Sequence, residues 1–352
     1  MQAMKKVAEY LSNSRVEPLF LTGDALEILQ EMPGWSIDCV MTSPPYWQKR
    51  EYANGGIGME ASYEEYIEKL LEVFANIYSV LKPAGSFWLN IGDSYLNKTL
   101  LGLPWRIALE MMKRQSWMLR NEIIWHKRRG GIDNTNDKLG NVHEQVFHFV
   151  KNPQYYYDAD AIRNKPGRSK VVNGSVVTAT GVSGVNYKRQ IKNTRYLTPV
   201  QKRHAYKALN ETLKEVKLKK IADFRMTIKG KQRVVHSNSK VVSGRARELQ
   251  KNGFYFVKYH PKGSKPRDVW RIMPEDSQNT DDHFAVYPEE LCRIPILATC
   301  PKEGVVLDPF CGMGTSNVVA YKYGKKSIGI DIASEYVGMA RWRCKNHKNI
   351  KT

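Results

Sequence analysis

Residues 305–331 constrain the fold more than any other part of this chain. The apolar run Val305-Val306-Leu307 leads into a loop that contains Gly312 and Gly314, and a helix-like stretch follows to Lys322. A second apolar run, 327–330, ends at Asp331, which lies 19 residues after Gly312. The glycines permit a tight turn and a close backbone approach to a ligand, and an acid at about this spacing grips ribose hydroxyls. The segment therefore predicts a nucleotide-binding unit of a doubly wound α/β fold.

The details of this loop predict which cofactor it binds. A dinucleotide site wants a third glycine, but the corresponding residue is Asn317. Asp308 leads into the loop, where a carboxylate would repel a pyrophosphate and suit an ammonium group. A cofactor with a ribose, an amino group and no phosphate fits, and S-adenosylmethionine has these features.

Apolar runs and helical patterns alternate along the rest of the chain. We expect strands at 19–21, 37–41, 85–91, 121–125 and 146–150, and helices ending near Met32 and spanning 63–81, 105–114 and 334–345. Strands that alternate with helices predict a mostly parallel sheet with helices on both faces.

The expected strand 37–41 runs directly into Thr42-Ser43-Pro44-Pro45-Tyr46-Trp47. Two prolines end strand pairing and hold the backbone carbonyls rigidly. The Ser43 side chain and the Pro44 carbonyl are suitable acceptors for the hydrogens of an exocyclic amine, which would free its lone pair for attack. Tyr46 offers a ring on which an extruded base can stack. The turn therefore predicts an amine-binding site.

The positive charge of the chain lies in one internal block. The 352 residues carry a net charge of +20, but residues 161–270 alone carry +22. Such a block needs a polyanionic partner, and without an aromatic ladder duplex nucleic acid is favoured over a single strand. At roughly 150 residues a domain, the length allows about two domains or one with an insertion. We expect a catalytic part at 1–160, a basic nucleic-acid-binding region at 161–270 and a cofactor-binding part at 271–352.

Within the basic region, composition predicts loops and short strands over 163–199, a helix over 199–222 and a strand from Gly253. Basic side chains there, and two that precede it, are the expected DNA contacts. They are Arg128, Arg129, Lys188, Arg189, Lys192, Arg195, Lys202, Arg203, Arg225, Lys229, Lys231, Arg233, Arg245 and Arg247.

These motifs resemble the amino-methyltransferases of DNA in the β-class order, in which the catalytic motif precedes the cofactor motif. Matching stretches cover almost everything outside the basic region; they include TSPPYW at 42–47, GSFWLNIGDSY at 85–95, HEQVFHFVKNPQYYYDADAI at 143–162 and VVLDPFCGMGTS at 305–316. Serine before Pro-Pro-Tyr is typical of the N4-cytosine branch, whereas the N6-adenine branch usually carries Asp or Asn.

The resemblance implies a Rossmann-like, S-adenosylmethionine-dependent fold and a role for each matched residue, and it implies that residues 161–270 are the target-recognition region. Ser43, Pro44, Pro45 and Tyr46 would bind the target amine. The implied cofactor pocket comprises Asp308, Phe310, Gly312 and Gly314 on the methionine side, Asp331 at the ribose, Asp24 and Ala25 at the adenine, and Phe284, Tyr287 and Pro288 closing over it. Cys311, which we interpret as a space-filler, and Thr315 complete the set.

The implied activity is site-specific methylation of N4 of a cytosine flipped out of double-stranded DNA, in a restriction-modification system. An N6-adenine enzyme, a non-catalytic DNA-binding protein and an RNA substrate stay open as alternatives. Arg128 and Arg129 stand where the family usually has an Asn-Pro-Met-Pro-like loop, which puts the base pocket in doubt there. A partner endonuclease and the choice between monomer and homodimer are undecided.

Other chemistries are disfavoured. C5 methylation needs a thiolate in a Pro-Cys dipeptide, and Cys300 instead precedes Pro301. The pair His143-Glu144 has no second histidine at metal-ligand spacing, so no metal is expected. The five scattered cysteines fit reduced thiols, and without a secretion signal or an apolar span we expect a cytoplasmic protein without membrane contact. Tyr155 to Tyr157 are expected to form a strand with two core tyrosines.

Overall fold

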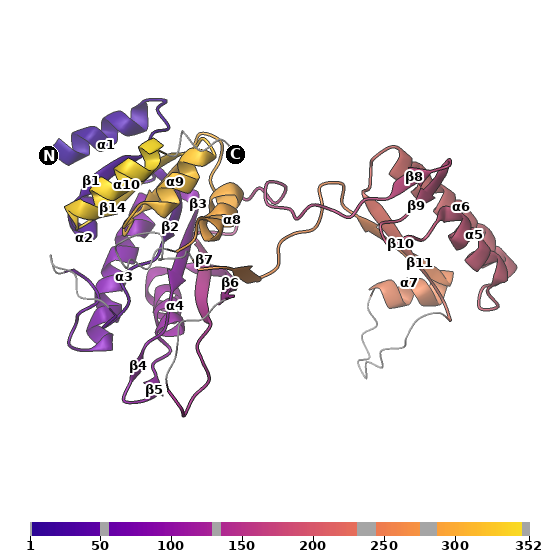
Figure 1. Ribbon diagram of the computed structural model, residues 1–352, viewed down its shortest axis with the longest axis horizontal. Helices are drawn as coiled ribbons and strands as arrows, with labels where there is room; N and C mark the ends of the chain where they lie inside the picture. Colours follow the sequence, from indigo (N-terminus) through magenta and orange to yellow (C-terminus); the bar gives the residue numbers. More distant parts are fainter. Residues whose placement is uncertain (1, 50–55, 129–134, 231–243, 275–286, 347–352) are drawn as a thin grey trace. The chain divides into compact units, whose positions relative to one another are not determined.

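The computed structural model describes residues 2–49, 56–128, 135–230, 244–274 and 287–346 (Figure 1). Contacts divide the chain into two compact units. The first comprises Met1–Ala161 with Arg267–Thr352, and the second comprises Ile162–Pro266. The larger unit is therefore assembled from both ends of the sequence.

An eight-stranded sheet organises the larger unit. Its order is β1 (Leu19–Thr22), β14 (Lys326–Asp331), β13 (Val305–Asp308), β2 (Ile37–Thr42), β3 (Leu81–Ile91), β7 (His143–Val150), β6 (Met118–Lys127) and β12 (Val269–Ile272). Among these eight strands β7 alone runs antiparallel to its neighbours. The carboxyl ends of seven strands and the first residues of β7 consequently share one edge of the sheet.

Helices cover both faces of this sheet. One face packs against α1 (Gln2–Ser12), α2 (Ala25–Glu31), α3 (Tyr63–Val80) and α4 (Leu103–Gln115), and the other against α8 (Glu289–Thr299), α9 (Thr315–Lys322) and α10 (Ser334–Asn346). Strand β2 shows the alternation, since Val40 lies in the first core while Cys39 and Met41 lie in the second. The predicted fold, a mostly parallel sheet with helices on both faces, is confirmed.

A short hairpin follows β3. Strands β4 (Tyr95–Leu96) and β5 (Thr99–Leu100) pair antiparallel around Asn97 and Lys98, whose φ angles are 48° and 66°. Positive φ at both central residues is what a tight two-residue hairpin turn requires.

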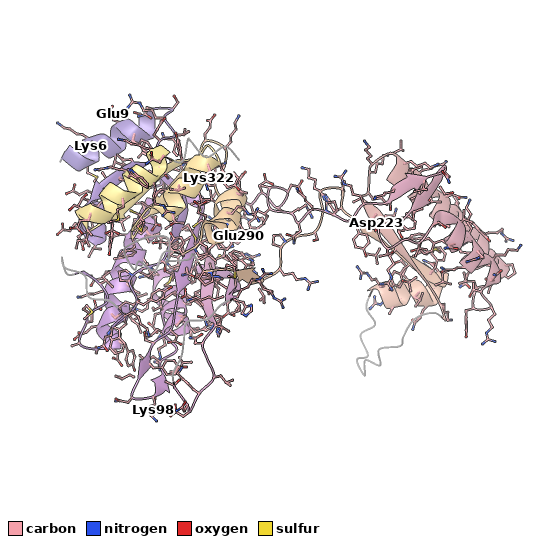
Figure 2. The ribbon with its side chains drawn as sticks, in the orientation of Figure 1. Lys6, Glu9, Lys98, Asp223, Glu290 and Lys322 are labelled. Atoms are coloured by element: carbon pink, nitrogen blue, oxygen red, sulfur yellow. The ribbon has the colours of Figure 1, made fainter. Side chains whose placement is uncertain are left out.

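The smaller unit has its own hydrophobic core. Two antiparallel strand pairs, β8 (Lys170–Val172) with β9 (Ser175–Val177) and β10 (Asp223–Ile228) with β11 (Phe254–Tyr259), combine with α5 (Gly184–Asn193), α6 (Pro199–Lys217) and α7 (Gly244–Asn252). Ala205, Leu209 and Val216 of α6 are buried in this core, as their spacing predicts. The buried Asp223 (Figure 2) accepts hydrogen bonds from Ser169 Oγ at 2.6 Å and the Ala179 amide, which ties the preceding loops to β10.

Several expectations about local structure are wrong. Residues 163–199 contain the helix α5 as well as loops and short strands. Helix α6 ends at Lys217 rather than residue 222, because Lys219 takes a left-handed conformation and the chain turns into β10. Residues 155–157 form no strand, and Tyr156 and Tyr157 are 38% and 41% exposed. The preceding strand β7 is already flanked by β3 and β6, so it offers no free edge for a further strand.

Lys326 joins α1 to the sheet. Its ammonium group is buried and donates at 2.6–3.1 Å to the carbonyls of Tyr10 and Leu11 in the last turn of α1 and of Asn13 just after it. Lys326→Met leaves these carbonyls without their donor, so we expect the free energy of unfolding to fall by about 1–3 kcal/mol. Urea denaturation measures the loss. Lys345→Met, at an exposed position of α10, is the control, and equal stability of the two variants would contradict the assignment.

No helix in the described ranges is long and apolar enough to span a membrane. All five cysteines are free and buried.

Candidate active site

The predicted cofactor and amine segments meet at the carboxyl edge of the sheet. Asp331 ends β14, Asp308 ends the neighbouring β13, and Ser43 follows β2, which pairs with β13. Asp24 follows β1, the other neighbour of β14. In open α/β sheets ligands bind outside the carboxyl ends of the strands, so four segments far apart in the sequence form one candidate site.

The Asp308 side chain connects several chain segments at this edge of the sheet. Its carboxylate is fully buried and accepts from Thr42 Oγ1 at 2.6 Å, Tyr287 Oη at 2.7 Å and Ser316 Oγ at 2.5 Å. The Phe310 amide is a fourth donor, at 3.2 Å. Burial raises the pKa of Asp308, and these donors oppose that shift. In this structure the carboxylate links β2, the segment before α8 and the start of α9, and the expected contact of Asp308 with an ammonium group stays a prediction.

The glycine loop has the backbone that the sequence predicts. Gly312 and Gly314 have φ angles of 49° and 72°, and Gly314 precedes the first residue of α9. A Cβ on Gly314 would lie 2.8 Å from Ala340 Cβ, so packing against α10 also requires glycine there. A Cβ on Gly312 would meet nothing within 4 Å, so that position combines left-handed backbone with open space.

Asp331 is held by the loop that it faces. One carboxylate oxygen accepts from the Gly312 amide at 2.8 Å and the other from the Ala333 amide at 2.9 Å. Burial raises its pKa, while the two amides favour the charged form. Each carboxylate oxygen keeps a lone pair, so Asp331 can still accept hydrogen bonds from two hydroxyl groups. Nearby, Asp24 caps α2 by accepting from the amides of Leu26 and Glu27, and Ala25 is buried.

The Ser-Pro-Pro-Tyr turn is fixed by the elements around it. Tyr66 of α3 donates to the Pro45 carbonyl at 2.9 Å, and the Tyr46 ring packs so closely on Gly92 that a Cβ there would lie 2.7 Å away. Pro44 is buried, while Ser43 and Tyr46 are half-buried. Burial, and next to it the charge of Glu144, raises the pKa of Tyr46 well above its usual value, so its hydroxyl keeps its proton.

Sequence reasoning missed three polar residues beside this turn. Glu144 at the start of β7 accepts from Tyr46 Oη at 2.8 Å, and Lys127 at the end of β6 pairs with Glu144. Asn90 of β3 lies within hydrogen-bond distance of Ser43, Tyr46 and Glu144. In the sequence, Asn90 is a polar residue inside the apolar run 86–91, and Glu144 is a glutamate at the start of a strand. Neither feature by itself indicates which residues it contacts.

The other predicted cofactor residues have different surroundings. Tyr287 is half-buried, Pro288 is the N-cap of α8, and Phe284 lies outside the described residues. Cys311 is buried in a cluster with Phe20 and Val318, and Phe310 packs against the large core. Thr315 is 2% exposed and accepts from Arg343, so its side chain faces α10.

Most of the predicted DNA contacts that the structure describes are exposed. They lie on α5 and just after it, on α6, on and after β10, on α7 and after β6; the exposed ones are Arg128, Lys188, Arg189, Lys192, Arg195, Arg203, Arg225, Lys229, Arg245 and Arg247. Lys202 instead donates to the Lys192 carbonyl at 2.8 Å and closes the end of α5. Arg129, Lys231 and Arg233 lie outside the described residues.

The carboxylates at this edge of the sheet fit S-adenosylmethionine better than a phosphate cofactor. Asp24, Asp308 and Asp331 bring three carboxylates to the ends of adjacent strands, which disfavours a pyrophosphate and suits ribose hydroxyls and a cation. The geometry of this edge is therefore compatible with the cofactor that the sequence predicts, and the Ser-Pro-Pro-Tyr turn lies beside it.

Comparison with known proteins identifies the family. The family model described as DNA methylase matches residues 37–341, so the chain belongs to that family, and its resemblance to the DNA amino-methyltransferases of restriction-modification systems is confirmed. The type II methyltransferase M.SfiI of Streptomyces fimbriatus is 29% identical over 378 residues, covering 90% of this chain and 88% of the relative. The protein is thus a DNA methyltransferase.

Two solved structures share the fold. PvuII DNA methyltransferase, described as cytosine-N4-specific, superimposes with a TM-score of 0.54 at 16% identity over 95% of this chain and 92% of its own. TTHA0409 of Thermus thermophilus, solved with S-adenosyl-L-methionine, has a TM-score of 0.50 at 18% identity over 94% and 93% of the two chains.

Proposed function

We propose that this protein transfers a methyl group from S-adenosylmethionine to N4 of a cytosine flipped out of duplex DNA. Ser43 carries the proposal, because a neutral hydroxyl stands at the head of the Pro-Pro-Tyr turn beside the cofactor loop. The likeness to the cytosine-N4-specific PvuII enzyme concerns the fold, and the choice of base rests on Ser43.

The chemistry requires an activated amine. The lone pair of an exocyclic amine is delocalised into the ring, so the amine is a weak nucleophile. We assign Ser43 Oγ and the Pro44 carbonyl as acceptors of the amine hydrogens, which draws the nitrogen towards tetrahedral geometry. Bound S-adenosylmethionine supplies an electrophilic methyl group. As the lone pair of the nitrogen forms the new N–C bond, the bond between the methyl carbon and the sulfonium sulfur would break and its electron pair would stay on the sulfur as a neutral thioether. The nitrogen returns to neutrality by losing one proton to solvent.

The cofactor residues divide into three groups in this proposal. Asp331 holds the ribose hydroxyls, Asp24 and Ala25 lie beside the adenine, and the loop at Phe310, Gly312 and Gly314 borders the methionine part. Tyr287 and Pro288 lie in the segment that closes over the cofactor. Asp308 accepts from the Phe310 amide and ties that loop to Thr42, Tyr287 and Ser316.

Asp331→Asn tests the ribose assignment. The substitution keeps the size of the side chain but removes its charge and one acceptor, so we expect the Kd for S-adenosylmethionine to rise about 10- to 100-fold. Isothermal titration calorimetry measures the change. Glu335→Gln, at the exposed start of α10, is the matched control. An unchanged Kd in the Asp331 variant would remove the carboxylate from the site.

The base assignment is tested by product analysis. DNA is incubated with the protein and cofactor carrying a labelled methyl group, and its nucleosides are then separated. We expect the label in N4-methylcytosine. Label in N6-methyladenine would replace cytosine by adenine, and label in 5-methylcytosine would overturn the amine mechanism. Cofactor binding without turnover would indicate a non-catalytic DNA-binding protein, and preference for structured RNA in competition would indicate an RNA substrate.

We further propose that the smaller unit recognises the target sequence. Its exposed basic side chains on α5, α6 and α7 are suited to duplex phosphates, and a subset of them would read base edges. A restriction endonuclease with the same recognition site is the proposed functional partner, and the protein acts as a monomer or a homodimer. Sequencing of modified positions in the DNA of an expressing host identifies the site.

A further inference from the structure

The role of Ser43 depends on the direction of its hydrogen bonds. A hydroxyl donates one hydrogen and can also accept hydrogen bonds at two lone pairs. If Ser43 is to activate an amine, its lone pair must face the amine and its own hydrogen must point elsewhere. The surrounding contacts therefore have to fix the orientation of the hydroxyl.

A chain of hydrogen bonds that begins at Glu144 provides this direction. A carboxylate has no hydrogen to give, so Tyr46 Oη must donate to Glu144 Oε2, at 2.8 Å. The Tyr46 oxygen is then free to accept, and Ser43 Oγ donates its hydrogen to it at 3.2 Å. Each bond in the chain follows from the one before it, and the last bond turns the Ser43 hydrogen towards Tyr46.

Asn90 reinforces this direction. Its Nδ2 lies 2.9 Å from Glu144 Oε2, 2.9 Å from Tyr46 Oη and 3.2 Å from Ser43 Oγ. The amide must present its donor to this group, because the carboxylate can only accept. Its Oδ1 is buried without a partner among the described residues, an arrangement that costs about 1–3 kcal/mol.

The remaining lone pair of Ser43 follows by counting. Its hydrogen points to Tyr46, and Asn90, whose NH₂ group has two hydrogens for three nearby acceptors, occupies at most one lone pair. At least one lone pair of Ser43 is therefore left for the amine. We propose that Glu144 is a positioning residue, which makes Ser43 a hydrogen-bond acceptor by acting through Tyr46. The inference rests on the proposed function, in which an exocyclic amine binds at Ser43.

The order of the strands explains why Glu144, which lies 101 residues after Ser43 in the sequence, takes this role. Strand β7 is antiparallel, so its first residues reach the edge where the parallel strands end. Glu144 is 9% exposed there and has Lys127 as its countercharge. Lys127 contacts Oε1, which leaves Oε2 to Tyr46 and Asn90. The two carboxylate oxygens therefore have separate partners.

Glu144→Gln reverses the chain of hydrogen bonds. Lys127 holds the amide oxygen of the new side chain, so its NH₂ group faces Tyr46 and donates to it. Tyr46 then donates its hydrogen to Ser43 and occupies the lone pair that would otherwise accept a hydrogen bond from the amine. We expect the single-turnover rate of methyl transfer to fall about 10- to 100-fold, with the Kd for cofactor and for DNA changed less than about threefold. Glu122→Gln, which alters a carboxylate on β6 that accepts from Trp105, should keep the wild-type rate.

A double substitution separates positioning from a merely structural role. Tyr46→Phe keeps the ring but removes the hydroxyl that transmits the direction, and should lower the rate about tenfold. When Glu144→Gln is added to the Tyr46→Phe variant, the rate should change less than about twofold further. A wild-type rate in the single Glu144 variant, or an undiminished loss in the double variant, overturns the proposal. If the Glu144 variants fail to bind cofactor, an unchanged rate in Tyr46→Phe overturns it instead.

Failure of the proposed function gives a different result. It is read from the wild-type protein, by the nucleoside that receives the label. A product of N6-methyladenine would reject cytosine and leave the role of Glu144 testable by the same rates, because adenine also presents an exocyclic amine.

Discussion

Ser43→Ala is expected to lower the rate of methyl transfer by about 10²- to 10³-fold while the protein still binds DNA and cofactor. The substitution removes an acceptor that engages the amine more strongly as positive charge develops on the nitrogen, and such preorganised groups typically contribute this much to a rate. Asp308, which anchors the cofactor loop, bonds to Thr42 and not to Ser43, so the cofactor site should persist. Single-turnover kinetics with labelled cofactor measure the rate.

The control for this experiment is the preceding residue, which ends β2. Thr42→Val removes the hydroxyl that donates to Asp308 and should weaken cofactor binding. The two substitutions should therefore have different effects: Ser43→Ala should lower the rate of methyl transfer, and Thr42→Val should lower the affinity for the cofactor. A Ser43→Ala variant with the wild-type rate would refute the amine-activating role, and one without cofactor affinity would assign Ser43 to the structure of the turn.

The fold of the larger unit was predictable because its strands are apolar runs bounded by strong signals. Strand β2 ends at two prolines, and β13 ends at a glycine loop whose positive φ angles only small residues tolerate well. Residues 305–331 bring a strand, a turn, a helix and an acid together within one short segment. Local chemistry and global fold agree there, which is why sequence reasoning succeeds.

The candidate site was predictable in part. Ser43, Gly312 and Asp331 belong to local motifs, so the sequence indicates them directly. Glu144, Asn90 and Lys127 come from three different strands, and their contacts exist because β7 is inserted antiparallel between β3 and β6. A sequence shows that such residues are polar, but not which strand lies beside which. Pairing across a sheet is a tertiary property.

Parts of the smaller unit were harder to predict because α5 and α7 are short and highly charged. Helix α5 has Ser183 as its N-cap and buries Tyr187 and Ile191 four residues apart. These two apolar residues are too few to stand out among the surrounding lysines and arginines. Helix α7 buries none of its residues, so no periodic pattern exists to find.

Neutralising four basic side chains of the smaller unit is expected to weaken DNA binding by about 10²- to 10³-fold at about 0.1 M salt. The variant combines Lys188→Gln, Arg189→Gln, Lys192→Gln and Arg203→Gln, all at exposed positions of α5 and α6. Each lost phosphate contact also reduces the release of counterions, so the slope of log K against log salt should become shallower by about 0.9 per contact. Fluorescence anisotropy with duplex DNA over a range of salt concentrations gives both quantities.

A control variant that loses the same charge on the larger unit shows whether the loss of DNA affinity comes from the surface of α5 and α6 or from the total charge. Lys5, Lys6, Lys113 and Lys345 are exposed there, and changing all four to glutamine removes as much charge from a different surface. If the smaller unit holds the duplex, this control should keep most of the affinity and most of the slope. Equal losses in the two variants would mean that total charge, rather than the surface of α5 and α6, attracts DNA. Because Lys202 closes the end of α5, it is left unchanged, so that a loss of binding reports on contact with DNA rather than on unfolding of the helix.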